Sequence, residues 1–258
     1  MSKKKSEPID WLVEQLRFSA FMSAPLAPNH ELDEWHRIAK SDPANVLTKP
    51  AEGVLRKEGE FDGKLLTYEQ SPLRIDWRLS SNGQNPFDES PWPVFGHLNS
   101  ETEKFIQLMK TWLTNAPPLN RIAFGLILLR PKNTNEDSLK LLGRVLPDIK
   151  IDHLNTRDFN YKINRRRKSK SISPKLEINR LSSWSIASLS HIAVELLQGQ
   201  TQGSRATEMT ERLYACRVEL DINTAPEFDS NIAKSKRKNL LDELNDLAIE
   251  LSLKGDIK

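Results

Sequence analysis

Alternation of apolar and polar residues predicts several β-strands in the first part of the chain. An extended run ends before Pro25, and one of its faces carries the apolar residues Leu12, Leu16, Phe18, Ala20 and Met22. The stretch 53–80 predicts a three-stranded meander. Within it the pair Asp62-Gly63 favours a hairpin turn, because both residues tolerate positive φ. A short helix is predicted over residues 31–40, followed later by a surface loop at 82–93 that is rich in Pro, Asn and Ser.

A helical period predicts three longer helices. The first spans 100–114 and begins at a capping box formed by Ser100 and Glu103. The second, at 135–146, follows a nearly continuous apolar run at 122–129 that predicts a buried central strand. The third spans 237–252 and carries one leucine-rich face. The side chains expected in the core are Phe105, Trp112, Phe124, Leu244 and Leu247.

The strands of the second half surround a basic segment. Residues 159–163 alternate and predict a strand, whose partner begins near Leu176 across a loop at 165–174. The stretch 184–197 fits both a strand and a helix. We favour a strand, because the polar residues 198–208 would then close a long hairpin onto a strand at 213–222.

The clearest organisational pattern is an internal echo. The run Arg74–Leu79 (RIDWRL) is echoed by Arg217–Ile222 (RVELDI), and an amphipathic helix follows each run after a Pro-containing gap. The pattern predicts an α+β fold with two similar antiparallel strand-then-helix lobes. The expected organisation is a disordered basic arm at 1–8, an N-terminal lobe at 9–147 and a C-terminal lobe at 148–258. Asp76 and Asp221 occupy matching places, and we interpret them as ion-pair partners of arginines such as Arg74 and Arg217.

Composition is that of an ordinary soluble protein of 258 residues, with 38% apolar and 28% charged residues. The net charge of +3 does not by itself indicate a nucleic-acid partner. Positive charge is concentrated, however: residues 156–180 hold nine basic and two acidic residues, a net +7, which leaves −4 for the rest. The single cysteine, Cys216, excludes an internal disulfide and fits a reducing compartment. No apolar run has the length of a signal peptide or membrane span, so we expect a cytoplasmic protein that does not bind membranes.

Basic residues supply the candidate binding site. They are Lys162, Arg165, Arg166, Arg167, Lys168 and Lys170, with a second run of Lys236, Arg237 and Lys238. We expect those at 165–170 to be exposed, since like charges are not buried without partners. Three interpretations stay open: binding to nucleic acid, docking of a protein partner, or plain solvation of a hairpin tip between two strands. Basic residues at the start of a helix oppose its dipole, which favours the binding interpretations.

Catalytic chemistry is not indicated by any motif. The run His30-Glu31-Leu32-Asp33-Glu34 has Glu34 where a zincin helix carries its second histidine. Glu60, Asp62 and Lys64 would suit a metal-dependent nuclease, but Asp62 is better assigned to the turn. Cys216 falls on an apolar strand face and is interpreted as a core thiol. No catalytic residue, metal or cofactor is therefore predicted.

The leading functional hypothesis is a non-enzymatic binding or assembly subunit of a larger cytoplasmic complex. Its partner would be another protein or a second copy of the chain. One alternative is a nucleic-acid-binding accessory protein that uses the basic hairpin. The other alternative is a metal-dependent nuclease or hydrolase.

Overall fold

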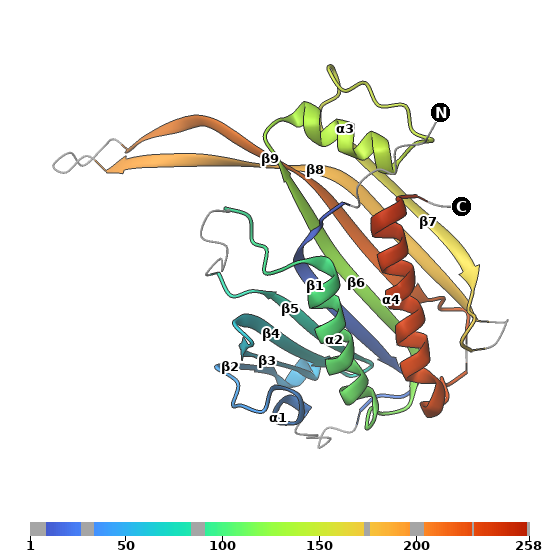
Figure 1. Ribbon diagram of the computed structural model, residues 1–258. Helices are drawn as coiled ribbons and strands as arrows, with labels where there is room; N and C mark the ends of the chain where they lie inside the picture. Colours follow the sequence, from blue (N-terminus) through green and yellow to red (C-terminus); the bar gives the residue numbers. More distant parts are fainter. Residues whose placement is uncertain are drawn as a thin grey trace.

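The protein is built on one antiparallel sheet of nine strands, in the order β2-β3-β4-β5-β1-β6-β9-β8-β7 (Figure 1). The computed structural model describes residues 9–26, 34–83, 91–172, 176–196, 204–228 and 230–256, with the backbone alone for the strand residues 191–196 and 204–211. The strands are β1 (Leu12–Met22), β2 (Asn45–Lys49), β3 (Val54–Phe61), β4 (Lys64–Ser71), β5 (Arg74–Ser81), β6 (Leu119–Lys132), β7 (Asn160–Lys168), β8 (Glu177–Leu196) and β9 (Ser204–Thr224).

The helices of the described ranges lie on one face of this sheet (Figure 1). They are α1 (Glu34–Ala39), α2 (Leu98–Leu113), α3 (Asn135–Val145) and α4 (Arg237–Lys254). Helix α2 contacts β1, whereas α4 contacts β6, β8 and β9, and the two helices contact each other. The three long helices and the α+β class are therefore confirmed. The predicted helix at 31–40 is described only from Glu34 onward.

The predicted capping box is wrong. Helix α2 begins at Leu98, two residues earlier than predicted, with His97 in the N-cap position. Ser100 therefore lies in the first turn, where its Oγ donates a hydrogen bond to the carbonyl oxygen of His97, 3.1 Å away. The hairpin turn is confirmed, since Asp62 and Gly63 have φ values of +52° and +74°.

The order of elements repeats along the chain. The first half runs β1-α1-β3-β4-β5-α2 and the second runs β6-α3-β7-β8-β9-α4, with β2 as an addition to the first. In each half the first strand pairs with the last strand of the meander, β1 with β5 and β6 with β9. The two first strands pair with each other at the centre, antiparallel. An approximate two-fold axis therefore passes between β1 and β6 and relates the two halves.

Both halves contribute to one continuous sheet, so the expectation of two separate lobes is not confirmed. Phe18 pairs with Phe124 across the axis; their partners on the outer side are Trp77 and Ile222. By this register Asp76, just before Trp77, corresponds to Asp221, just before Ile222. The sequence echo, which aligns Arg74 with Arg217, is two residues out of the structural register. A shift of two preserves the face of every side chain, which is why the alternation looked the same.

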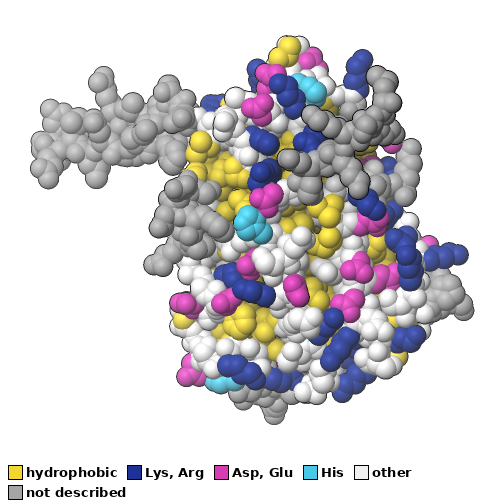
Figure 2. All heavy atoms as spheres, in the orientation of Figure 1, with side chains coloured by type: hydrophobic (Ala, Val, Ile, Leu, Met, Phe, Trp, Pro, Cys, Tyr) yellow, Lys and Arg dark blue, Asp and Glu magenta, His cyan; other side chains and the backbone are white. Residues whose placement is uncertain are grey.

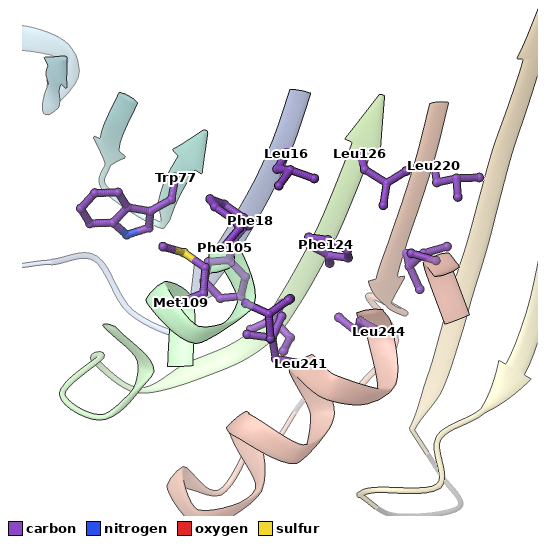
Figure 3. Packing of buried hydrophobic residues seen from close by; sticks show 14 of the residues in the cluster. Leu16, Phe18, Trp77, Phe105, Met109, Phe124, Leu126, Leu220, Leu241 and Leu244 are labelled. Carbon is purple, nitrogen blue, oxygen red and sulfur yellow. The ribbon is translucent and has the colours of Figure 1, made fainter. Parts of the chain in front are cut away.

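The main core lies between the sheet and the helices. Side chains from β1, β5, β6 and β9 meet those of α2 and α4 in Figure 3, where the labelled residues are Leu16, Phe18, Trp77, Phe105, Met109, Phe124, Leu126, Leu220, Leu241 and Leu244. The Phe105 and Phe124 ring centroids are 6.4 Å apart, and the ring of Trp112 packs edge-on at 5.6 Å from Phe18. The burial predicted for five core side chains is confirmed, with exposed fractions between 0% and 4%.

A second apolar cluster lies on the opposite face of the sheet. Trp92 and Val94 are buried there against Leu129 and Ala215, and Leu189 and Leu213 pack at its margin. Backbone hydrogen bonds fix the covering segment, since Phe95 N donates to Val13 O at 3.0 Å and Val13 N donates to Gly96 O at 2.8 Å. The predicted surface loop at 82–93 is wrong at Trp92, which is 4% exposed; residues 84–90 and the predicted arm at 1–8 lie outside the described residues.

Replacing Phe124 with Ala should lower the free energy of unfolding by about 3–5 kcal/mol, because the side chain is fully buried at the central strand pair and would leave a cavity. Urea denaturation measures this change. Replacing Leu154 with Ala is the control: the side chain is 67% exposed, and the expected change is within about 0.5 kcal/mol. Equal midpoints for the two variants would contradict the assignment of Phe124 to the core.

Candidate interaction site: the basic edge and the β-arm

Strand β7 forms one end of the described sheet and carries the first basic run. It pairs with β8 from Asn160, opposite Ser185, to Lys168, opposite Glu177. Arg165, Arg166 and Arg167 therefore lie in the strand, and the prediction of a loop starting at 165 is wrong. Alternation divides the basic side chains, because successive residues of a strand point to opposite faces of the sheet. Lys162, Arg166 and Lys168 share one face, while Arg165 and Arg167 share the face that carries the helices.

Arg165 is held by the C-terminal segment. Its Nε donates to Asp256 Oδ1 at 2.6 Å and its Nη2 donates to Oδ2 at 2.8 Å, while the hydroxyl of Tyr161 also donates to Oδ2 at 2.8 Å. The Arg165 guanidinium is the main cause that lowers the pKa of the Asp256 carboxyl. Arg165 and Arg167 are only partly exposed, which corrects the expectation that all five cations at 165–170 would be exposed. Burial of Arg165 is tolerated because Asp256 is its counter-ion.

Arg166 stands on the other face and remains accessible. Its Nη2 donates to Glu227 Oε1 at 2.8 Å, and its Nε donates to Asn179 Oδ1 at 3.0 Å. Glu177 lies 3.4 Å from Nη1, a weaker contact. The hydrogen bond to Glu227 is the main cause that raises the pKa of Arg166. With 44% of its side chain exposed, Arg166 can still contact a ligand.

A buried carboxylate joins the end of β7 to α4. Glu243 accepts hydrogen bonds from Ser169 Oγ at 2.8 Å, from Lys170 N at 2.7 Å, and from the N and Oγ of Ser171 at 3.0 and 2.6 Å. Desolvation raises the pKa of Glu243, but these hydrogen bonds outweigh it and the net shift is downward. Glu243 thereby places Lys170 beside the start of α4. Single-sequence patterns miss this role, because Glu243 is one of several acidic residues on an amphipathic helix.

The second basic run meets the first at this corner. Lys236 Nζ donates to the carbonyl oxygen of Ser171 at 3.4 Å. Arg237, by contrast, is 5% exposed and points inward, where its guanidinium donates to the carbonyl oxygens of Ile232, Ala116 and Pro117 at 3.1, 3.0 and 2.8 Å. It therefore joins the end of the α2 segment to the start of α4 and is not part of the surface.

We name the exposed cations of this corner the basic edge. They are Lys162, Arg166, Lys168, Lys170, Lys234, Lys236 and Lys238. Figure 2 shows Lys and Arg side chains along the side of the molecule where Figure 1 places β7 and the start of α4. The adjacent hollow between β7 and α4, about 360 Å³, is lined by Lys170 and Arg167 together with acidic side chains, among them Asp242, Asp246 and Glu250. Apart from Lys170, the cations of the basic edge do not line this hollow and spread over an outer surface.

The second candidate surface is the end of the β8–β9 hairpin. Pairing of β8 with β7 stops at Ser185, and pairing of β9 with β6 stops at Tyr214. Beyond these points, at 186–196 and 204–213, the two strands pair only with each other within the described chain and project from the sheet (Figure 1). We name this ribbon the β-arm. The strand interpretation of 184–197 and the long hairpin are confirmed, although β9 begins at Ser204, well before the predicted 213.

The open face, meaning the sheet face opposite the helices, is lined at its centre by ion pairs. Asp76 pairs with Arg74 at 2.7 Å, and its equivalent Asp221 pairs with Arg17 at 3.0 Å. The predicted partner of Asp76 is confirmed, but that of Asp221 is Arg17 and not Arg217. Gly125 explains the difference: a Cβ there would lie 3.2 Å from Arg17 Nη2, so the absence of a side chain lets Arg17 cross β6 to reach β9.

The residues considered for catalysis have structural partners. Lys64 Nζ lies 3.0 Å from Glu101 and 3.2 Å from Asp62, which also contacts Lys104. His30 lies outside the described residues. Within the described ranges, no group of three or more His, Cys, Asp and Glu side chains is arranged to hold a metal ion. Cys216 is buried as predicted, its Sγ donates to Ser138 O at 3.1 Å, and burial raises the pKa of its thiol to about 12.

Comparison with known proteins adds no family to this description: no family model matches the chain, and no curated protein matches it. Among the helices in the described ranges, none is long and apolar enough to cross a membrane.

Cys216 should not react with a thiol reagent in the native protein at pH 8, because the thiol is buried and its pKa is about 12. Colorimetric titration should count one thiol per chain in denaturant and none in buffer on the same timescale. Rapid reaction of the folded protein would place Cys216 at the surface.

Stability should fall on acidification partly through Glu243 and Asp256. The folded-state pKa of each carboxyl is lowered, so the stability they contribute is present above their unfolded values, near about 4, and is lost as the pH falls through the folded values. Replacing Glu243 with Gln should cost about 1–3 kcal/mol at pH 7, because buried donors lose a charged acceptor. Urea midpoints from pH 7 to 3 should converge for the variant and the wild type.

The matched control for this series is Glu103→Gln at an exposed position of α2. It should keep the wild-type dependence of stability on pH. If Glu243→Gln also keeps it, the loop at 169–172 is not stabilised by this carboxylate.

Proposed function

We propose that the protein is a non-enzymatic assembly subunit that docks a partner protein through the β-arm. The observation that carries this proposal is the pairing pattern: both strands leave the sheet at Ser185 and Tyr214 and continue as a two-stranded ribbon. Backbone N–H and C=O groups are obligatory hydrogen-bonding groups, and a free strand edge offers a row of them to another chain. Addition of a partner strand is a recurring mode of protein recognition.

The length of the β-arm supports a role in docking. Residues 186–196 make eleven positions of β8, or roughly 35 Å of extended chain. A two-stranded ribbon of this kind is marginally stable in water by itself. A partner that adds a strand would satisfy the outer backbone groups and raise the stability of the ribbon.

The base of the β-arm packs against other parts of the protein on both faces, which fixes the position from which the ribbon projects. On the open face, Trp92 and Val94 pack against Ala215 of β9 and Leu129 of β6. On the helix-bearing face, nearer the centre of the sheet, Trp184 of β8 and Val218 of β9 are fully buried in the main core. A partner that binds the β-arm would therefore contact strands whose other ends belong to the main core.

A shortened hairpin tests the proposal. Leu189 and Leu213 are directly opposite in the register, so residues 190–212 can be replaced by Asn-Gly, which forms a two-residue turn between paired strands. In cells that make the protein naturally, photo-crosslinking from Leu189 should capture a defined partner protein, identified by mass spectrometry. The shortened chain should lose that partner while keeping the wild-type melting temperature within a few degrees.

Crosslinking from the exposed Leu154 is the control and should not capture the same partner. If the partner is a second copy of the chain, sedimentation of the purified protein should show a dimer that the shortened chain does not form. Retention of the same partner by a folded, shortened chain would refute the proposal.

A further inference from the structure

We infer a second site, separate from the β-arm: the basic edge binds the phosphate backbone of a nucleic acid. Its seven exposed cations come from β7, from the loop after it and from the start of α4, so two runs separated by more than 60 residues form one surface. Among the described ion pairs, this surface involves Glu177 and Glu227, and both pair with Arg166. In the hollow beside Lys170, Asp242 pairs with Lys110 and Glu250 with Lys254, while Glu243 accepts hydrogen bonds from Ser169 and Lys170. The cations of the surface, other than Arg166, therefore keep their charge available for a ligand. Lys and Arg that neutralise phosphates release counterions, which drives association.

The arrangement along β7 suits an extended ligand. Lys162, Arg166 and Lys168 share the open face, and alternate residues of a strand lie about 7 Å apart. Each cation can thus meet a separate phosphate group. Asn160 lies beside them on the same face; its Oδ1 accepts from the Ser183 hydroxyl at 3.4 Å, and its amide N–H groups can donate a neutral hydrogen bond to a phosphate oxygen.

The lysines at the start of α4 lower the stability of the helix. The N-terminus of a helix carries partial positive charge, so Lys234, Lys236 and Lys238 raise an already positive potential. The Glu243 carboxylate brings Lys170 to the same place and directs its own charge at the loop backbone. The corner is therefore built to concentrate positive charge at a cost to the free protein.

The direction of the side chains favours nucleic acid over an acidic protein segment. A protein strand that used β7 for docking would add at its free edge, through backbone hydrogen bonds in the plane of the sheet. Lys162, Arg166 and Lys168 stand perpendicular to that plane, over the open face. They present charge to a ligand that lies across the face and corner, as a phosphate backbone would.

Salt-dependent binding to a 20-base-pair duplex DNA and to a duplex RNA of the same length tests the inference. Fluorescence anisotropy from about 50 to 300 mM salt gives the slope of log affinity against log salt. The variant Lys162→Gln, Lys168→Gln, Lys170→Gln, Lys236→Gln should bind more weakly, with a slope smaller by about one unit per lost phosphate contact, or up to about four. All four side chains are exposed, so the melting temperature should be unchanged.

The matched control removes four exposed lysines elsewhere: Lys40→Gln, Lys49→Gln, Lys140→Gln, Lys150→Gln. It has the same net charge as the test variant and should bind like the wild type. Equal losses in both variants, or no binding by the wild type at about 50 mM salt, would overturn the inference. Preferential binding of a polyglutamate peptide would overturn it in favour of an acidic protein partner.

The chain with the shortened hairpin separates this site from the β-arm. It should bind both duplexes as the wild type does, whether or not it loses its partner protein. Loss of nucleic-acid binding on shortening would place the site on the β-arm and contradict the assignment to the basic edge.

Discussion

The antiparallel pair of β1 and β6 is the constraint on which the rest of the structure depends. Phe18 and Phe124 face each other at this pair, and both are fully buried beneath α2 and α4. Each strand then fixes the last strand of its own meander, so the register at the centre sets the position of every other strand. The approximate two-fold axis is a consequence of this pairing. It places the Asp76 and Asp221 carboxylates at equivalent points on the open face, although each finds a different arginine.

Glycine at position 125 shows how the two halves can differ in their side-chain contacts while they keep the same strand order and register. By the two-fold register its counterpart is Ser19, whose hydroxyl donates to Asp76. With no side chain at 125, Arg17 lies across β6 instead and reaches Asp221. One half thus satisfies its carboxylate from its own strand and the neighbouring one, and the arginine of the other half comes from two strands away. The result is a network that ties β1 to β9 through the middle of the sheet.

Local patterns were sufficient to predict most elements. Alternation located β1 and the meander, leucine spacing located α4, and the Asp62-Gly63 pair located a turn, because each depends on residues close in sequence. Long-range features were not predictable in this way. Trp92 is buried because the base of a hairpin distant in sequence provides an apolar surface. Arg237 points inward because three backbone carbonyl oxygens accept hydrogen bonds from its guanidinium there. The sequence showed both basic runs, but their meeting depends on Glu243, whose role appears only when β7 and α4 are adjacent.

The central pairing also sets the order in which the strands of the sheet can pair during synthesis. Among the described strands β1 is synthesised first, yet its second neighbour, β6, lies about a hundred residues later, and β6 in turn pairs with the still later β9. Until then β1 can pair only with β5; the backbone N–H and C=O groups of its other edge stay open to any other strand, and apolar side chains such as Phe18 lie on its face. Contacts this distant in sequence slow folding, and unpaired apolar edges promote aggregation. A nascent chain that is released or stalled between β5 and β6 therefore contains about half of the sheet, and the strands that pair with the open edge of β1 have not yet been synthesised.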